Sequence, residues 1–212
     1  HFMLKEIHEQ PAVLADCLAK YVHHHQIALP VEYDFTKTDR IIMVACGTAH
    51  IACTVAKYWF EQLAGLPVEV DIASEYRYRQ PPISEKSFSL FVSQSGETAD
   101  TLAALRYCAG KVDQIISIVN VPESSIARES DLALPILAGA EIGVASTKAF
   151  TCQLTTLALL ALKAAKDMGR ITDADLAEKL SALRAMSGVI NTALAIEEKS
   201  KSVASKLAEA RD

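Results

Sequence analysis

The chain has 212 residues, of which 50 % are apolar and 22 % charged, and its formal net charge is −5. This length suits one α/β domain with helical extensions. An acidic chain lacks the overall positive charge that draws proteins to nucleic acids or anionic membranes. The sequence contains no apolar run of about 18 residues and no charged-then-apolar leader. We therefore expect a cytoplasmic protein with neither nucleic acid nor membrane as a partner.

Cysteine and histidine residues indicate neither a disulfide framework nor a metal site. The five cysteines are odd in number, widely spaced and without a Cys-x-x-Cys pair, so we expect mostly reduced core thiols. His23, His24 and His25 are adjacent, and adjacent residues do not share a helix face. A solvated helix end is therefore favoured over a metal tract. We predict no metal and no cofactor.

Apolar periodicity predicts one α/β domain. A helix is expected over 3–21, with Pro11 as a kink or break. From residue 41 onward short apolar runs alternate with helical stretches, which is typical of a parallel sheet covered by helices on both faces. The fold class is thus a three-layer α/β sandwich with a five-stranded parallel sheet. The expected strands are 41–45, 68–72, 88–92, 115–119 and 132–136, with helices at about 50–64 and 97–109.

The last third of the chain is predicted to be helical, over about 146–168, 172–186 and 189 to the end. The first of these helices has no charge between Lys148 and Lys163, and a helix that is apolar all round must be buried on several sides. We expect a second subunit, in a homodimer, or a further domain to cover it. The predicted division is an N-terminal helical extension (1–30), the sheet domain (31–170) and C-terminal helices (171–212).

Three polar loops follow predicted strands, at residues 45–50, 93–98 and 139–148. Parallel sheets bind ligands at the carboxyl ends of their strands. The loop 93–98 brings three hydroxyls to a helix N-terminus, and no Lys or Arg occurs from 87 to 105. This indicates an anion held by neutral donors. Taken alone, the loop also fits an ordinary turn with Ser95 as N-cap. Together the three loops predict a site for a phosphorylated, polyhydroxylated ligand.

These loops resemble those of the sugar isomerase (SIS) domain family. The segments 46–48, 93–98 and 141–148 match its motifs, and the stretches 1–7, 73–79 and 128–134 are similar to the first SIS domain of the glutamine–fructose-6-phosphate aminotransferases. The resemblance covers essentially the whole chain. It implies a flavodoxin-like SIS fold and a sugar phosphate, fructose 6-phosphate or glucosamine 6-phosphate, as the small-molecule partner.

The resemblance also implies the site residues. Those that would contact the sugar phosphate are Thr48, Ser93, Gln94, Ser95, Thr98, Val144 and Ser146. Ala49 departs from the family pattern, which often has Ser at that position. The family's catalytic residues belong to a second SIS domain and a C-terminal loop, and a glutaminase domain precedes both SIS domains in the full-length parent. We therefore expect this chain, which opens at His1 rather than Met, to bind the sugar phosphate without isomerising it.

Two alternatives stay open. One is a non-catalytic SIS sensor that binds an amino-sugar phosphate and regulates a partner. The other is a sugar-phosphate deaminase or isomerase of the same fold. Flanking sequence distinguishes them, since a glutaminase domain supports the aminotransferase and a DNA-binding helix-turn-helix supports the sensor.

Overall fold

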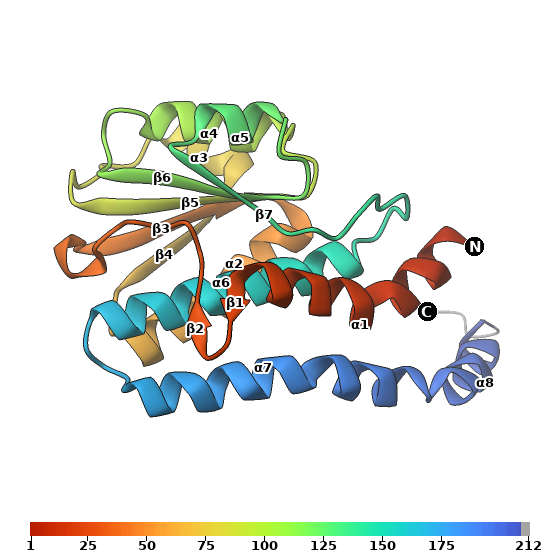
Figure 1. Ribbon diagram of the computed structural model, residues 1–212. Coiled ribbons are helices and arrows are strands. Elements are labelled where there is room, and N and C mark those ends of the chain that lie inside the picture. Colours follow the sequence, from red (N-terminus) through yellow and green to blue (C-terminus); the bar gives the residue numbers. More distant parts are fainter. Residues whose placement is uncertain (209–212) are drawn as a thin grey trace.

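A computed structural model describes residues 1–208 (Figure 1) and contains the predicted five-stranded parallel sheet, in the order β4-β3-β5-β6-β7. The predicted fold class is confirmed, and each strand lies within one residue of its expected bounds. The strands are β3 (Arg40–Ala45), β4 (Val68–Ile72), β5 (Ser87–Ser93), β6 (Gln114–Val119) and β7 (Leu132–Pro135).

The order of the strands creates a switch point between β3 and β5. The chain leaves β3 to build β4 on one side and then returns to build β5 on the other. Ala45 at the end of β3 pairs with Val92 near the end of β5. The loops that follow these two strands therefore start side by side, at the place where open α/β sheets bind ligands.

One face of the sheet is covered by three short helices: α3 (Ala73–Arg79), α4 (Ala99–Cys108) and α5 (Ser125–Glu129). Their shared core includes the fully buried side chains of Tyr76, Phe91 and Leu105. Helix α3 was not predicted from the sequence. Its seven residues are too few to establish a helical period against the background of the neighbouring strand.

The other face carries two layers of helices (Figure 1). Helix α2 (Gly47–Trp59), its π-helical continuation η2 (Phe60–Ala64) and α6 (Lys148–Asp167) pack together against the sheet. Helix α1 (Phe2–Tyr21) lies beside α6, where the Tyr21 hydroxyl donates to the Pro135 carbonyl of β7. Helix α7 (Asp173–Leu194) forms the outer layer, and α8 (Glu197–Leu207) follows. Helix α1 continues through Pro11 without a break. The expected helix end near Gly188 is wrong, because α7 runs on to Leu194; a single interior glycine costs a helix only about 1 kcal/mol.

The three adjacent histidines do not lie at a helix end. Helix α1 stops at Tyr21, and the chain forms a small antiparallel hairpin of β1 (Val22–His23) and β2 (Gln26–Ile27). His24 has a left-handed backbone (φ +56°), as a tight turn requires. The only other short element before the sheet, within the described residues, is the 3-10 helix η1 (Phe35–Lys37).

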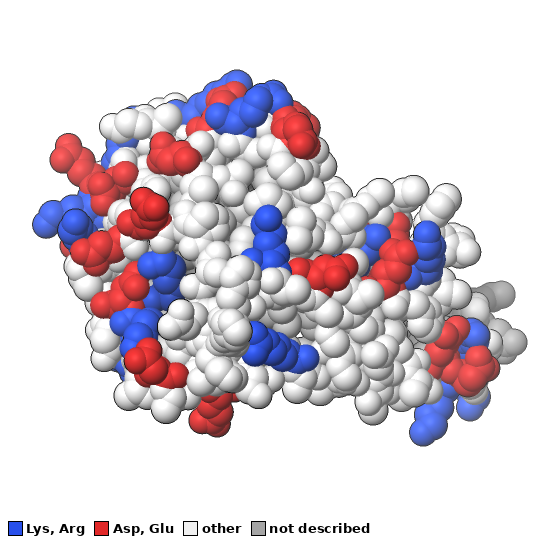
Figure 2. Space-filling model, in the orientation of Figure 1, with Lys and Arg blue, Asp and Glu red and all other residues white. Residues whose placement is uncertain are grey.

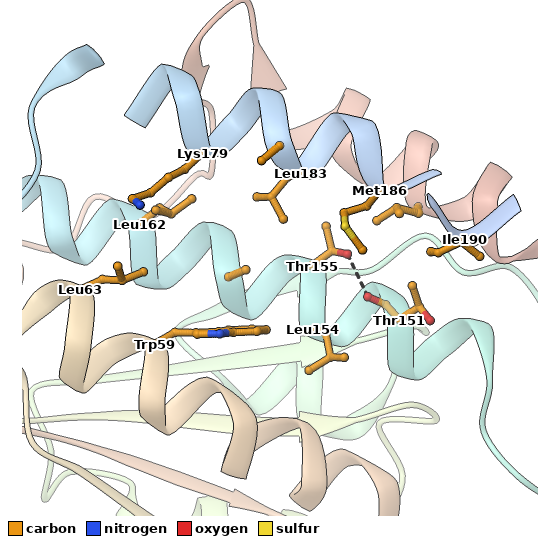
Figure 3. A pocket seen from close by; sticks show the side chains of 13 residues that line it. Trp59, Leu63, Thr151, Leu154, Thr155, Leu162, Lys179, Leu183, Met186 and Ile190 are labelled. Atoms are coloured by element: carbon orange, nitrogen blue, oxygen red, sulfur yellow. Dashed lines mark hydrogen bonds between the residues drawn. The ribbon is translucent and has the colours of Figure 1, made fainter. Parts of the chain in front are cut away.

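Helix α6 is the most buried helix of the structure, and its own chain covers it. Leu157 and Leu160 are fully buried, and α6 contacts α1, α2, η2 and α7. The expectation that a second subunit or a further domain covers α6 is therefore wrong, because it underestimated the area that α1 and α7 supply. An apolar groove of about 460 Å³ remains open, lined by side chains of α1, α2, η2, α6 and α7 (Figure 3).

Across residues 1–208, none of the helices combines the length and apolarity needed to cross a bilayer. On the face shown in Figure 2, acidic and basic side chains are interspersed, so this face carries no basic stripe of the kind that binds nucleic acid.

Candidate functional site

A polar cavity of about 210 Å³ lies at the carboxyl edge of the sheet, next to the ends of β3 and β5. It brings together six of the seven predicted site residues and adds four that were not predicted. The lining residues are Cys46, Thr48, Ala49, Val92, Ser93, Gln94, Ser95, Thr98, Ser146 and Gln153. The seventh predicted residue, Val144, is fully exposed and does not line the cavity. None of the ten lining side chains is an acid or a cation.

Local hydrogen bonds shape the turn that follows β5. The Ser93 hydroxyl accepts a hydrogen bond from the Gly96 N–H at 3.0 Å and shares another with the Thr98 hydroxyl, also at 3.0 Å. The Ser95 hydroxyl accepts the Glu97 N–H at 3.2 Å. Ser93 is buried and Ser95 exposed. Ser93 therefore stabilises the turn from its buried side, whereas Ser95 lies on the solvent-exposed side of the cavity.

Contacts with α5 fix this turn in place. Gly96 has a left-handed backbone (φ +66°), and a Cβ there would lie 1.9 Å from the Ser124 hydroxyl oxygen. The Gly96 carbonyl accepts the Ile126 N–H at 3.0 Å, and the Glu97 carboxylate accepts the Ser125 N–H at 2.7 Å. The second bond lowers the pKa of Glu97. Only glycine fits this position without moving α5.

Two helix N-termini without side-chain caps face the cavity. Helix α2 begins after Cys46 and α4 after Thr98, and neither N-cap side chain bonds its own helix. The first backbone N–H groups of a helix have no partner inside it, and the helix dipole places partial positive charge there. An anion is therefore favoured at this edge of the cavity. Ser95 is not the N-cap of α4, which starts two residues later than expected.

The third loop, before α6, differs in its electrostatics. The Glu141 carboxylate accepts the N–H groups of Thr147 at 2.9 Å and of Ala149 at 3.2 Å, and the Ser146 hydroxyl at 3.0 Å. A negative charge of the protein itself therefore occupies the N-terminus of α6. This loop brings the Ser146 hydroxyl to the cavity but does not offer a second anion site.

Side chains of helix α1 contact the same loop and stabilise it. Glu6 is 3 % exposed, and its carboxylate accepts the N–H groups of Ile142 and Gly143. Lys148 is 4 % exposed and pairs with Glu9 at 2.7 Å, which lowers the pKa of Glu9. Neither glutamate was singled out from the sequence. The available signal was that Glu6 shares a helix face with the apolar Phe2 and Met3, one turn earlier.

Gln153 is one of the four lining residues that were not predicted. It lies in α6, lines the cavity and is 1 % exposed. Its signal was a lone amide inside an apolar helical run, between Cys152 and Leu154.

The lining suits binding better than proton transfer. General acid–base catalysis needs a titratable group near neutrality within hydrogen-bond reach of the substrate. Cys46 is the only titratable side chain among the ten lining residues. His50 does not line the cavity, and its ring Nδ1 lies 3.3 Å from the Asp71 carbonyl oxygen.

Comparison with known proteins places this site in a family. A family model described as "SIS domain" matches residues 34–163. The chain is 51 % identical over 216 residues to a glutamine–fructose-6-phosphate aminotransferase [isomerizing] of Bradyrhizobium diazoefficiens, covering all of this chain and 36 % of that protein. It is 54 % identical over 201 residues to the same-named protein of Brucella abortus, covering 93 % of this chain and 33 % of that one.

A solved structure agrees with these matches. The C-terminal domain of glucosamine-fructose-6-phosphate aminotransferase from Francisella tularensis superposes with a TM-score of 0.94 at 40 % identity, covering 99 % of this chain and 60 % of that one. The chain spans about a third of the length of the two curated relatives. The family model matches more than half of the chain, and its span contains all seven predicted site residues. The chain therefore belongs to the SIS domain family.

Proposed function

We propose that this chain binds a hexose 6-phosphate, with the phosphate at the 93–98 turn. The observation that carries the proposal is the pair of uncapped helix N-termini, α2 and α4, on a cavity without charged side chains. Backbone N–H groups and hydroxyls hold phosphate well, and hydrogen bonds to a charged group are stronger than neutral ones. The cavity is smaller than the ~300–1,000 Å³ of pockets for drug-sized ligands, which suits a small metabolite.

For the parent protein we propose the activity named in its relatives, glutamine–fructose-6-phosphate aminotransferase. In that proposal this chain supplies the first SIS domain over about 31–170, flanked by the helical segments 1–30 and 171–212. A glutaminase domain and a second SIS domain would carry the catalytic groups, in a cytoplasmic homodimer. The length of the relatives, about three times that of this chain, supports further domains in the parent.

Titration calorimetry with fructose 6-phosphate tests the binding proposal. Ser95→Ala should weaken binding by about 1–2 kcal/mol, because it removes one hydroxyl from a charged ligand. Ser181→Ala, on the exposed surface of α7, is the matched control and should have no effect. Inorganic phosphate should compete with the sugar phosphate. Equal affinities of the Ser95 and Ser181 variants, or no competition, would contradict a phosphate site at this turn.

The proposal also predicts that the purified 212-residue chain does not interconvert fructose 6-phosphate and glucose 6-phosphate. The cavity lining contains no carboxylate, histidine or lysine to move a proton. A coupled spectrophotometric assay measures this directly. Turnover that co-purifies with the chain and disappears in Cys46→Ala would show that the lining supplies the base after all.

A further inference from the structure

The side-chain carbonyl oxygen of Gln153 is a buried polar atom without a partner among the described residues. This Oε1 atom is shielded from solvent and makes no hydrogen bond within residues 1–208, and the whole residue is 1 % exposed. A buried polar atom that lacks a partner costs about 1–3 kcal/mol, so such atoms are rare unless something else satisfies them. Because Gln153 lines the polar cavity, the missing partner can come from the cavity itself.

The surroundings of Gln153 differ from those of the 93–98 turn. Gln153 comes from α6, whose N-terminus is already occupied by the Glu141 carboxylate. The turn comes from β5 and leads into the uncapped N-terminus of α4. The cavity therefore has an end that favours an anion and a wall that offers a neutral amide.

An amide matches a sugar hydroxyl better than a phosphate. The oxygens of a phosphate dianion only accept hydrogen bonds, and the carbonyl oxygen of Gln153 would repel them. A hydroxyl both donates and accepts, so it can bond to either end of an amide. The chemistry of this wall thus fits the uncharged, polyhydroxylated part of the ligand.

We propose that Gln153 is a specificity-determining residue, whose amide hydrogen-bonds an oxygen of the sugar chain while the 93–98 turn holds the phosphate. This assignment rests on the proposed function, because it concerns the same cavity and deepens the account of its ligand. Gln153 selects for phosphorylated ligands that carry hydroxyls far enough from the phosphate to reach α6.

Three ligands of increasing length test the assignment: inorganic phosphate, glycerol 3-phosphate and fructose 6-phosphate. The variant Gln153→Met keeps the size of the side chain and removes the amide. It should weaken fructose 6-phosphate binding about five- to tenfold, the range of one net hydrogen bond, and leave phosphate affinity unchanged. The loss with glycerol 3-phosphate should be smaller than with fructose 6-phosphate.

A matched control exists in the same chain. Gln114, at the start of β6, also has a buried Oε1 without a partner, but it lies at the amino end of the strand and not in the cavity lining. Gln114→Met should leave the affinities for all three ligands unchanged. Without ligand, Gln153→Met should melt no lower than the unaltered chain, because the substitution removes an unsatisfied polar atom.

If Gln153→Met binds fructose 6-phosphate as well as the unaltered chain does, or loses affinity equally for all three ligands, the role of Gln153 is overturned while the proposed function stands. If the unaltered chain binds none of the three, the proposed function fails and the assignment with it. Gln153→Asn provides a second route should the Met variant fold poorly. It retains the amide but withdraws it by one methylene, and it should also lower fructose 6-phosphate affinity without lowering phosphate affinity; equal affinity for the sugar phosphate would again overturn the assignment.

Discussion

Replacing Gly96 by alanine should destabilise the protein by about 2–5 kcal/mol. Two independent costs contribute. A left-handed backbone costs a residue with a Cβ about 1–2 kcal/mol, and Gly96 has φ +66°. The new Cβ would also lie 1.9 Å from the Ser124 hydroxyl oxygen and 2.4 Å from the Ser124 Cβ. Forcing an extra group into a packed site typically costs about 1–3 kcal/mol.

Substitutions at two other glycines separate the cost of the left-handed backbone from the cost of the clash with Ser124. Gly47 shares the left-handed backbone (φ +56°) but a Cβ there meets nothing within 4 Å, so Gly47→Ala should cost only about 1–2 kcal/mol. Gly188 lies inside α7, where a Cβ also meets nothing. Gly188→Ala should stabilise the helix by about 0.5–1 kcal/mol. Urea unfolding followed by circular dichroism measures all three free energies.

The clash has its own test. Ser124→Gly removes both atoms that clash with the new Cβ and leaves Val119 Cγ1 in ordinary contact at 3.5 Å. Combining it with Gly96→Ala should therefore bring the cost back to that of Gly47→Ala. The single Gly96→Ala variant should also lose phosphate binding, because the 93–98 turn must move. Equal destabilisation by Gly96→Ala and Gly47→Ala, or no rescue by Ser124→Gly, would refute the reasoning.

Three further outcomes are expected. Glu6→Ala should lower the free energy of unfolding by about 1–3 kcal/mol, measured by urea unfolding, because the N–H groups of Ile142 and Gly143 lose a buried, charged acceptor. Leu160→Glu should prevent folding, since Leu160 is fully buried, whereas Val189→Glu should change the free energy of unfolding by no more than about 0.5 kcal/mol, since Val189 is 55 % exposed. Equal losses of the two variants in urea unfolding would contradict this. The Ser125 N–H lowers the pKa of Glu97. Ionised Glu97 therefore stabilises the folded state above the ordinary glutamate pKa of about 4.3, and this stabilisation is lost as the pH falls below that value. In thermal melts, Glu97→Gln should reduce the fall of the melting temperature at acid pH.

The sheet could be predicted because strands that are buried on both faces are continuous apolar runs in the sequence. Each strand is a short run of apolar residues between polar turns, and β5 is buried along its whole length. The position of the 93–98 hydroxyls at the carboxyl edge of the sheet could be predicted for the same reason, since they follow such a strand directly. Periodicity and turn chemistry are local properties, and a single sequence displays them.

Contacts between distant segments could not be predicted. Glu6 and Ile142 are 136 residues apart, and nothing local to either residue indicates that one accepts a hydrogen bond from the other. The same holds for the coverage of α6, which depends on how α1 and α7 pack. A helix that is apolar all round reveals that it is buried, but not whether its own chain or another one buries it.

In the binding mode proposed above, the position of the phosphate follows from which helix ends are already occupied. Three helices, α2, α4 and α6, begin at the cavity, and each would attract an anion by its dipole alone. Glu141 supplies that anion for α6 from within the protein, so the ligand's charge is directed to α2 and α4. The sugar chain must then extend toward α6, where Ser146 and Gln153 offer uncharged polar groups. In this proposed binding mode, one internal carboxylate orients the ligand without touching it, because it removes the alternative site for the phosphate.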